Sequence, residues 1–268
     1  MTVQSPDRHT AEFERVLDAP KDAPWLVMVH GMSQDRRVFS SQVAAFRDRF
    51  RILLIDLPGH GLSADVPGPF GHSEFANAVV QAMQQAGVNR CHYWGTHTGA
   101  TVGLLLAVSE PEQFASLILE GPVMPGEAPT SVAGALGQAR EVARTDGIEA
   151  AKTWWFAETP WFKVMHDNPI DCRRADHKKI VDDFTGAPWL SDATPSAVAF
   201  ASSDLHDLSL PVLVYNGEHD HPDFLSTAKT IATLIPGCRH EAIEKGGGFP
   251  AWEYPEQVNA LLRDFLGE

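Results

Sequence analysis

The sequence is short of basic residues, cysteines and long apolar runs. Its 268 residues include 21 lysines and arginines against 35 aspartates and glutamates, a formal net charge of −14 with histidine neutral. The lysines and arginines are few and scattered, so they form no basic stripe that could bind a phosphate backbone or an anionic lipid surface. No nucleic-acid partner is therefore expected. No segment approaches the roughly 18 to 20 consecutive apolar residues that span a bilayer, so no membrane partner is expected either.

The three cysteines, Cys91, Cys172 and Cys238, are odd in number and far apart. This pattern favours free thiols in a reducing compartment over a disulfide framework. The first 23 residues are polar and mixed in charge, without the apolar stretch and small-residue cleavage site of a signal peptide. We therefore expect a cytoplasmic protein.

Short apolar runs alternate with longer amphipathic stretches, which is typical of a mostly parallel sheet with helices on both faces. The helix expected over 73–87 has apolar residues at a spacing of three to four. Further helices are expected over 100–108 and from about 255 to 266. The expected strands cover 25–29, 51–56, 90–94, 117–119 and 212–215.

The interval between residues 123 and 207 contains helix-like stretches and no convincing strand. It also holds an aromatic cluster, made of Trp154, Trp155, Phe156, Trp161 and Phe162. These rings are either the ordinary core of a helical subdomain or the walls of a pocket closed by a cap. We expect a core formed by residues 1–123 and 208–268, interrupted by a helical cap at 124–207.

Four segments, taken in chain order, resemble motifs of the α/β-hydrolase superfamily. The resemblance implies an α/β-hydrolase fold, with a mostly parallel sheet, helices on both faces and a helical cap. The segments correspond to the family's oxyanion loop, its next strand end, its nucleophile elbow (G-x-S-x-G) and its acid loop. They read Val29-His30-Gly31-Met32, Asp56-Leu57-Pro58-Gly59-His60-Gly61-Leu62-Ser63, Gly95-Thr96-His97-Thr98-Gly99 and Asn216-Gly217-Glu218-His219-Asp220.

The resemblance assigns roles by position, but the central elbow residue is His97 rather than Ser, Cys or Asp. The flanking glycines permit the tight strand-to-helix turn that presents this side chain. The oxyanion donors carried over are the backbone N–H groups of Met32 and Thr98. The family's acid corresponds to Asp220, and Glu120, at the end of another strand, is the alternative acid.

A second departure lies near the end of the chain, where the family's catalytic histidine corresponds to Gly248. The site thus loses one imidazole and gains another, at His97. Because histidine is longer than serine, the His97 ring is expected to reach the space beside Gly248 and to pair with Asp220. An unperturbed imidazole pKa of about 6.5 suits a general base near neutral pH.

Three functions stay open. The first is an enzyme that acts on a small apolar carbonyl compound (an ester, a lactone or a C–C bond) with His97 and Asp220 as general base. The second is a conventional ester or lactone hydrolase with a His97 nucleophile, and the third is a non-catalytic ligand-binding protein. The expected pocket residues are Trp154, Trp155, Trp161, Phe162, Phe249 and Trp252.

The expected partner is therefore a small-molecule substrate, and a homodimer through the cap or an edge strand is left open. No cofactor motif is present, and no cofactor is expected. His219, His221 and Asp223 flank Asp220 in a pattern that invites a metal site, but the resemblance explains Asp220 without one. His30 and His60 lie in strand-end motifs, where a structural hydrogen-bonding role is expected.

Overall fold

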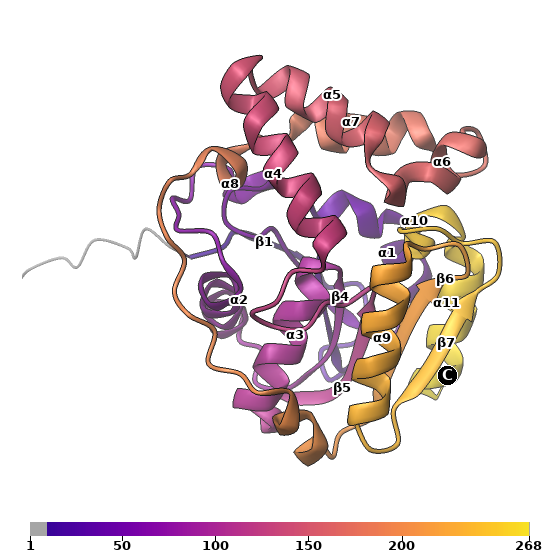
Figure 1. Ribbon diagram of the computed structural model, residues 1–268. Coiled ribbons are helices and arrows are strands. Elements are labelled where there is room, and N and C mark those ends of the chain that lie inside the picture. Colours follow the sequence, from indigo (N-terminus) through magenta and orange to yellow (C-terminus); the bar gives the residue numbers. More distant parts are fainter. Residues whose placement is uncertain (1–9, 268) are drawn as a thin grey trace, which may run out of the picture.

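The computed structural model describes residues 10–267, and these contain one seven-stranded sheet (Figure 1). The strand order is β1-β3-β2-β4-β5-β6-β7. Among these described strands only β1 is antiparallel to its neighbour, so the sheet is mostly parallel as the sequence predicts. The strands are β1 (Phe13–Val16), β2 (Trp25–Val29), β3 (Arg51–Ile55), β4 (Cys91–Thr96), β5 (Phe114–Glu120), β6 (Val212–Gly217) and β7 (Arg239–Ile243).

Helices cover both faces of the sheet because alternate strand residues point to opposite sides. Val27 and Val29 of β2 pack in one apolar cluster with α2 (His72–Ala86), α3 (Thr98–Ser109) and α9 (Pro222–Leu234). Leu26 and Met28 pack in a second cluster with α1 (Ser40–Phe46) and α11 (Pro255–Leu266). A short helix, α10 (Pro250–Glu253), precedes α11, and single 3-10 turns are formed by Arg36–Phe39, Gly61–Ser63, Pro111–Gln113, Pro160–Phe162 and Ser202–Asp207.

Residues 124–207, between β5 and β6, contain five α-helices and no strand. Figure 1 shows most of these helices together at one end of the sheet, above the carboxyl ends of the parallel strands. In α/β folds these strand ends carry the functional groups, so the insertion covers the place where a site is expected. The helices are α4 (Thr130–Thr145), α5 (Ile148–Glu158), α6 (Lys163–Asp167), α7 (Arg174–Asp183) and α8 (Ala187–Leu190).

Two expectations from composition can be compared with this structure. Cys91, Cys172 and Cys238 are all free thiols, as predicted. Within residues 10–267, no helix combines the length and the apolar character that crossing a bilayer requires.

Candidate active site

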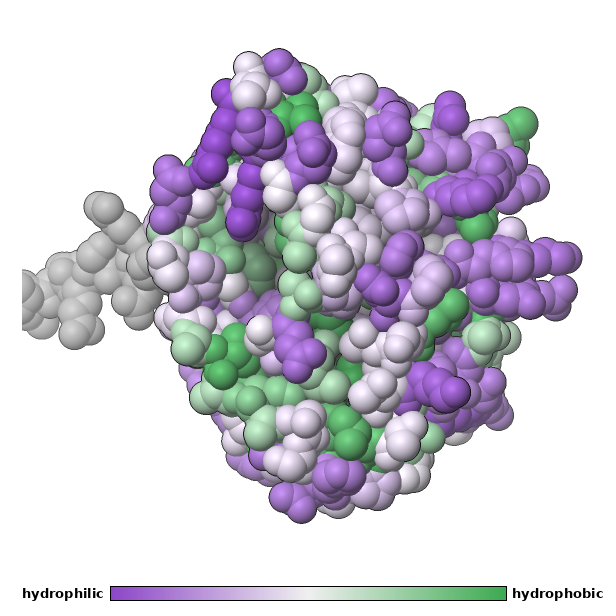
Figure 2. Space-filling model, viewed as in Figure 1, coloured by the Kyte–Doolittle hydropathy of each residue, from purple (hydrophilic) through white to green (hydrophobic). Residues whose placement is uncertain are grey.

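A cavity of about 330 Å³ lies between the strand ends and the inserted helices. Figure 2 shows the molecular face hollowed beside α4, with hydrophobic surface inside the hollow. A volume of this size accepts a small organic molecule. The apolar walls are Met32, Phe70, Phe75, Val123, Val132, Leu136, Trp155, Trp161, Pro188, Trp189, Val198, Phe224 and Phe249, and the polar side chains are His72, His97, Thr98, Glu127, Arg140 and Ser196.

Three of the six predicted pocket rings, Trp155, Trp161 and Phe249, line this cavity. The other three predictions are wrong for this cavity. Phe162 is fully buried and stacks on the far side of Phe249, with ring centroids 4.9 Å apart. Trp252 donates its indole N–H to the carbonyl oxygen of Cys172, and Trp154 packs against the second apolar cluster.

Sequence reasoning missed several walls that come from other parts of the chain. Phe70 and Phe75 belong to the segment before and within α2, Trp189 to α8, and Phe224 to α9. The aromatic cluster of the inserted helices could be recognised because its rings lie close together in the sequence. These four residues are isolated in the sequence and become neighbours only in the folded protein.

His97 lies in the strained turn that the sequence predicts between β4 and α3. Its backbone has φ 47° and ψ −107°, a conformation that non-glycine residues rarely adopt. The flanking glycines are required by close packing. A Cβ on Gly95 would lie 2.3 Å from the Gly99 carbonyl carbon, and a Cβ on Gly99 would lie 2.1 Å from the Val29 oxygen.

The partly buried His97 imidazole is held by main-chain groups and by aromatic rings. Its Nε2–H donates to the Gly248 carbonyl oxygen at 2.6 Å. The rings of Phe224 and Phe249 contact it edge-on at 5.1 and 4.9 Å, and a Cβ on Gly121 would lie 2.9 Å from its Cε1. Burial lowers the pKa of His97 to about 4, although the carbonyls of Gly248 and Gly121 act in the opposite direction. The imidazole is therefore neutral at pH 7.

The predicted pairing of His97 with Asp220 is wrong as a direct contact. Within residues 10–267, no hydrogen bond or ion pair joins the two side chains. Asp220 instead accepts from the Asn216 amide at 2.8 Å and from the His221 N–H at 2.7 Å. Burial without a cation raises the pKa of Asp220 to about 7. The expected pair does not form because the His97 imidazole bonds the Gly248 carbonyl oxygen instead of a carboxylate.

The alternative acid, Glu120, does not bond the imidazole either. Its carboxylate accepts from the Tyr215 hydroxyl and from the Ala251 N–H, each at 2.9 Å. Its pKa is raised to about 8 by burial, with contributions from the nearby carboxylates of Glu253 and Asp220. Burial also raises the pKa of Glu253 to about 8. Glu120, Asp220 and Glu253 are thus three buried carboxyl groups with raised pKa values that do not line the cavity, and Glu253 was not among the predicted site residues.

The space expected beside Gly248 is already filled. A Cβ on Gly248 would lie 2.6 Å from the Trp161 Cβ and 2.7 Å from the Trp161 carbonyl oxygen. The Cβ and the backbone atoms of Trp161 cannot move aside as easily as the end of a flexible side chain can. His97 therefore reaches the Gly248 carbonyl but does not occupy the volume of a side chain at position 248.

The two predicted oxyanion donors belong to residues that line the cavity. Met32 and Thr98 both line it, and within the described part of the chain neither backbone N–H has a hydrogen-bond acceptor. Thr98 is the first residue of α3, so its N–H also carries the positive end of the helix dipole. The pair fits the partial negative charge of a carbonyl oxygen.

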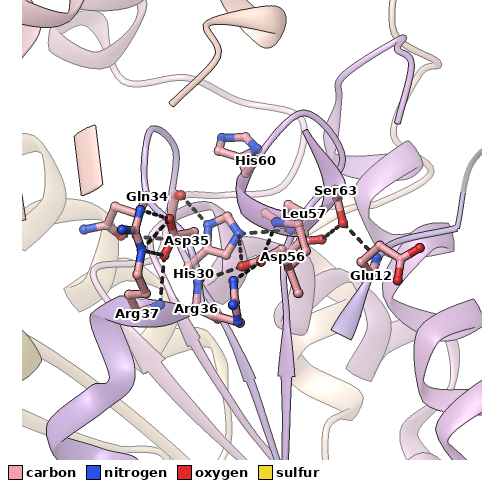
Figure 3. A network of polar contacts seen from close by, with 12 residues as sticks. Glu12, His30, Gln34, Asp35, Arg36, Arg37, Asp56, Leu57, His60 and Ser63 are labelled. Atoms are coloured by element: carbon pink, nitrogen blue, oxygen red, sulfur yellow. Dashed lines mark hydrogen bonds and ion pairs between the residues drawn. The ribbon is translucent and has the colours of Figure 1, made fainter. Parts of the chain in front are cut away.

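The loop that carries Met32 is anchored by buried histidines (Figure 3). His30 accepts from the Leu57 N–H at 2.9 Å and donates to the Gly31 carbonyl at 2.7 Å. His60 accepts from the Ser33 N–H at 3.3 Å. These contacts agree with the structural role expected for His30 and His60.

An ion pair completes this anchor. Asp56 accepts from the Arg36 backbone N–H at 2.7 Å and from its guanidinium at 2.8 Å, and Figure 3 shows both beside His30. Asp56 is fully buried. Asp56, which follows β3, therefore helps to hold the loop that carries Met32, in addition to the hydrogen bonds of His30 and His60.

His221, one of the residues that flank Asp220, has a role in capping a helix. His221 accepts from the Asp223 N–H at 3.2 Å and so caps α9. Among residues 10–267, no group of three or more His, Cys, Asp or Glu side chains is arranged to hold a metal ion.

Comparisons with known proteins give a consistent result. The model of the alpha/beta hydrolase fold family matches residues 24–255. The chain is 27% identical over 224 residues to 3-oxoadipate enol-lactonase 2 of Acinetobacter baylyi, covering 83% of this chain and 81% of that protein. It is 26% identical over 258 residues to a pimeloyl-[acyl-carrier protein] methyl ester esterase of Aeromonas hydrophila, covering 91% and 96%. The crystal structure of an enol-lactonase from Burkholderia xenovorans superposes with a TM-score of 0.81 at 22% identity, covering 96% and 97%.

Proposed function

The chain belongs to the α/β-hydrolase fold family, and on this premise we propose that it is a hydrolase of a small, apolar ester or lactone. One observation carries the proposal: His97, Met32 and Thr98 line the same apolar cavity, and within the described residues the N–H groups of Met32 and Thr98 have no hydrogen-bond acceptor. A base and two oxyanion donors are the minimum that acyl transfer to water requires. The lactonase and esterase names of two relatives support this class of bond.

The proposed mechanism uses His97 as a general base. The substrate carbonyl oxygen accepts from the two free N–H groups. Nδ1 of the neutral imidazole, the ring nitrogen that does not donate to the Gly248 carbonyl, takes a proton from a water molecule as that water attacks the carbonyl carbon. The tetrahedral oxyanion stays between Met32 and Thr98. When it collapses, the carbon–oxygen bond of the leaving group breaks, and the imidazolium returns its proton to the leaving oxygen.

The surroundings of His97 allow its protonated form to exist only briefly, because burial opposes the charge while two carbonyls partly stabilise it. The carbonyls of Gly248 and Gly121 stabilise the protonated ring, which substitutes for part of the usual role of the acid. The pKa near 4 makes the neutral ring a weak base but its conjugate acid a strong proton donor to the leaving group. This balance suits activated esters and strained lactones better than amides.

Two alternatives keep specific support. A His97 nucleophile would form an acyl-imidazole on the same elbow. A non-catalytic binding role is favoured by the filled space at Gly248 and by the absence of a contact between Asp220 and an imidazole in the described residues.

A chromogenic ester distinguishes these functions. We expect the wild type to hydrolyse p-nitrophenyl butyrate, His97→Ala and His97→Gln to lose at least about a hundredfold in kcat/KM, and His166→Gln to stay near wild type. His166 is the control because this half-buried histidine bonds the Phe156 carbonyl and does not line the cavity. A burst of p-nitrophenol equal to the enzyme concentration identifies a nucleophile. Equal turnover by wild type and His97→Ala, or no turnover of p-nitrophenyl butyrate and a lactone panel, refutes the proposal.

A further inference from the structure

A buried amide connects the inserted helices to the oxyanion loop. The Gly31 N–H donates to Gln34 Oε1 at 3.2 Å, and Gln34 Nε2 lies 3.2 Å from Nε2 of His177. Gln34 is 3% exposed and His177 is fully buried. His177 belongs to α7, so one side chain joins two segments that are 143 residues apart in sequence.

The hydrogen-bond roles in this contact follow from the Gly31 N–H. Because that group is a donor, the Gln34 oxygen faces it and the amide nitrogen faces His177. His177 Nε2 must then accept, which puts its ring hydrogen on Nδ1. Burial lowers the pKa of His177 to about 3, so the ring stays neutral and keeps this role at working pH.

This arrangement leaves one polar group without a partner. Within the described residues, Nδ1 of His177 is buried and has no hydrogen-bond partner. The ring is surrounded by Phe162, Phe249 and Trp252, with centroids 5.0 to 5.5 Å away. Buried N–H groups without acceptors are rare, and an apolar ring would fill the same volume without one. The histidine is therefore explained by its contact with Gln34 rather than by packing.

We propose that His177 is a positioning residue for the oxyanion hole. By holding Gln34, it fixes the Gly31 N–H and so directs the next N–H, that of Met32, into the cavity. Gly31 packs closely against this amide and the elbow, because a Cβ there would lie 3.0 Å from Gln34 Oε1 and 3.1 Å from the His97 Cβ. The oxyanion hole is thus complete only when α7 is seated on the core. This inference rests on the proposed function for the role of Met32.

The test replaces His177 in two ways. His177→Phe keeps an aromatic ring but removes the acceptor, whereas His177→Gln offers a side-chain oxygen near the position of Nε2. Gln34→Met removes the connecting amide from the other side, in case His177→Phe does not fold. His166→Phe is the matched control, because this half-buried histidine of α6 bonds the Phe156 carbonyl at 2.7 Å and does not contact Gln34.

Two readouts separate positioning from general stability. In His177→Phe and Gln34→Met, hydrogen exchange of the Gly31 amide should be roughly tenfold faster. The kcat for p-nitrophenyl butyrate should fall roughly ten- to hundredfold with KM nearly unchanged, as expected for a misplaced oxyanion donor. His177→Gln should recover most of both readouts, and His166→Phe should change neither.

Unchanged Gly31 exchange in a folded His177→Phe protein would overturn the inference. Faster exchange with unchanged kcat would also overturn it, because the bond would then be structural only. If the wild type hydrolyses no ester, the proposed function fails, and the exchange data alone decide whether His177 holds the loop.

Discussion

Replacing Asp220 with Asn should make the protein more stable at alkaline pH. The prediction follows from the missing contact with His97, since a buried carboxyl group without a cation is stabilised in its protonated form. The substitution fits the local hydrogen bonds. The Asn216 amide, which now donates to Asp220, has a buried oxygen without a partner in the described residues and needs only to rotate to accept from the new amide.

The sign and size come from the pKa of Asp220, which is about 7 in the folded protein against an ordinary value of 3.8. Between these values the unfolded chain releases a proton that the folded protein retains, so the free energy of unfolding falls as the pH rises. At about 1.4 kcal/mol per pH unit, the loss reaches up to about 4 kcal/mol and is complete above pH 7. The Asp220→Asn variant should not lose this stability as the pH rises. Below pH 4, its free energy of unfolding should depend on pH in the same way as that of the wild type.

Urea unfolding followed by tryptophan fluorescence from pH 4 to pH 9 measures this difference. Asp223→Asn is a control of opposite sign, because hydrogen bonds from the Ser131 hydroxyl and N–H lower the pKa of Asp223, so its removal should cost stability above pH 4. If Asp220→Asn is instead less stable than wild type at pH 8 by a margin that disappears at pH 4, Asp220 has a cationic partner. The pairing predicted from the sequence would then be correct, and the site geometry given above would be wrong.

Three further predictions concern the elbow and its surroundings. Turnover of p-nitrophenyl butyrate should fall as the pH drops through about 4, because protonation of His97 removes the base; a rate profile from pH 3.5 to 8 checks this. Gly248→Ala should lower the free energy of unfolding by about 1–3 kcal/mol, because the new methyl group would clash with Trp161. Gly134→Ala is the control, since this glycine lies at an exposed position of α4 with open space around it, and the substitution should raise the free energy of unfolding by about 0.5–1 kcal/mol. Asp56→Ala should cost about 1–3 kcal/mol in urea unfolding, since it leaves the backbone N–H groups of Arg36 and Leu62 without their acceptor while the Arg36 guanidinium keeps Glu14.

The interior of the fold could be predicted from the sequence, but its edges could not. β2 and β6 are buried along their whole length, so their apolar runs were visible. β1 and β7, the two edge strands, were missed. β1 exposes both of its central residues, and β7 exposes His240 and Ala242 and buries only its last residue, Ile243. A strand paired on one side only does not need a continuous apolar run.

The backbone of the candidate site was similarly predictable, but its side-chain pairing was not. The elbow conformation at His97 follows from two glycines that are adjacent to it in the chain. The contact of its imidazole depends on Gly121 and Gly248, and on Trp161 filling the place of a side chain at position 248. No local spacing reports such packing, since these residues come from three separate elements.

The contact of the His97 imidazole with a carbonyl oxygen, rather than with a carboxylate, affects the charge of the site as well as its geometry. In a His–Asp pair each charged group stabilises the other. Here burial lowers the pKa of His97 to about 4 with no carboxylate contact from the described residues to oppose it, and burial without a cation raises the pKa of Asp220 to about 7. Both groups are thus shifted toward their neutral forms, which lowers the charge density beside an already apolar cavity. Beside His97 such a site favours a neutral carbonyl group, whereas a charged substrate group would find its compensation at Arg140 or Glu127 in the cavity wall.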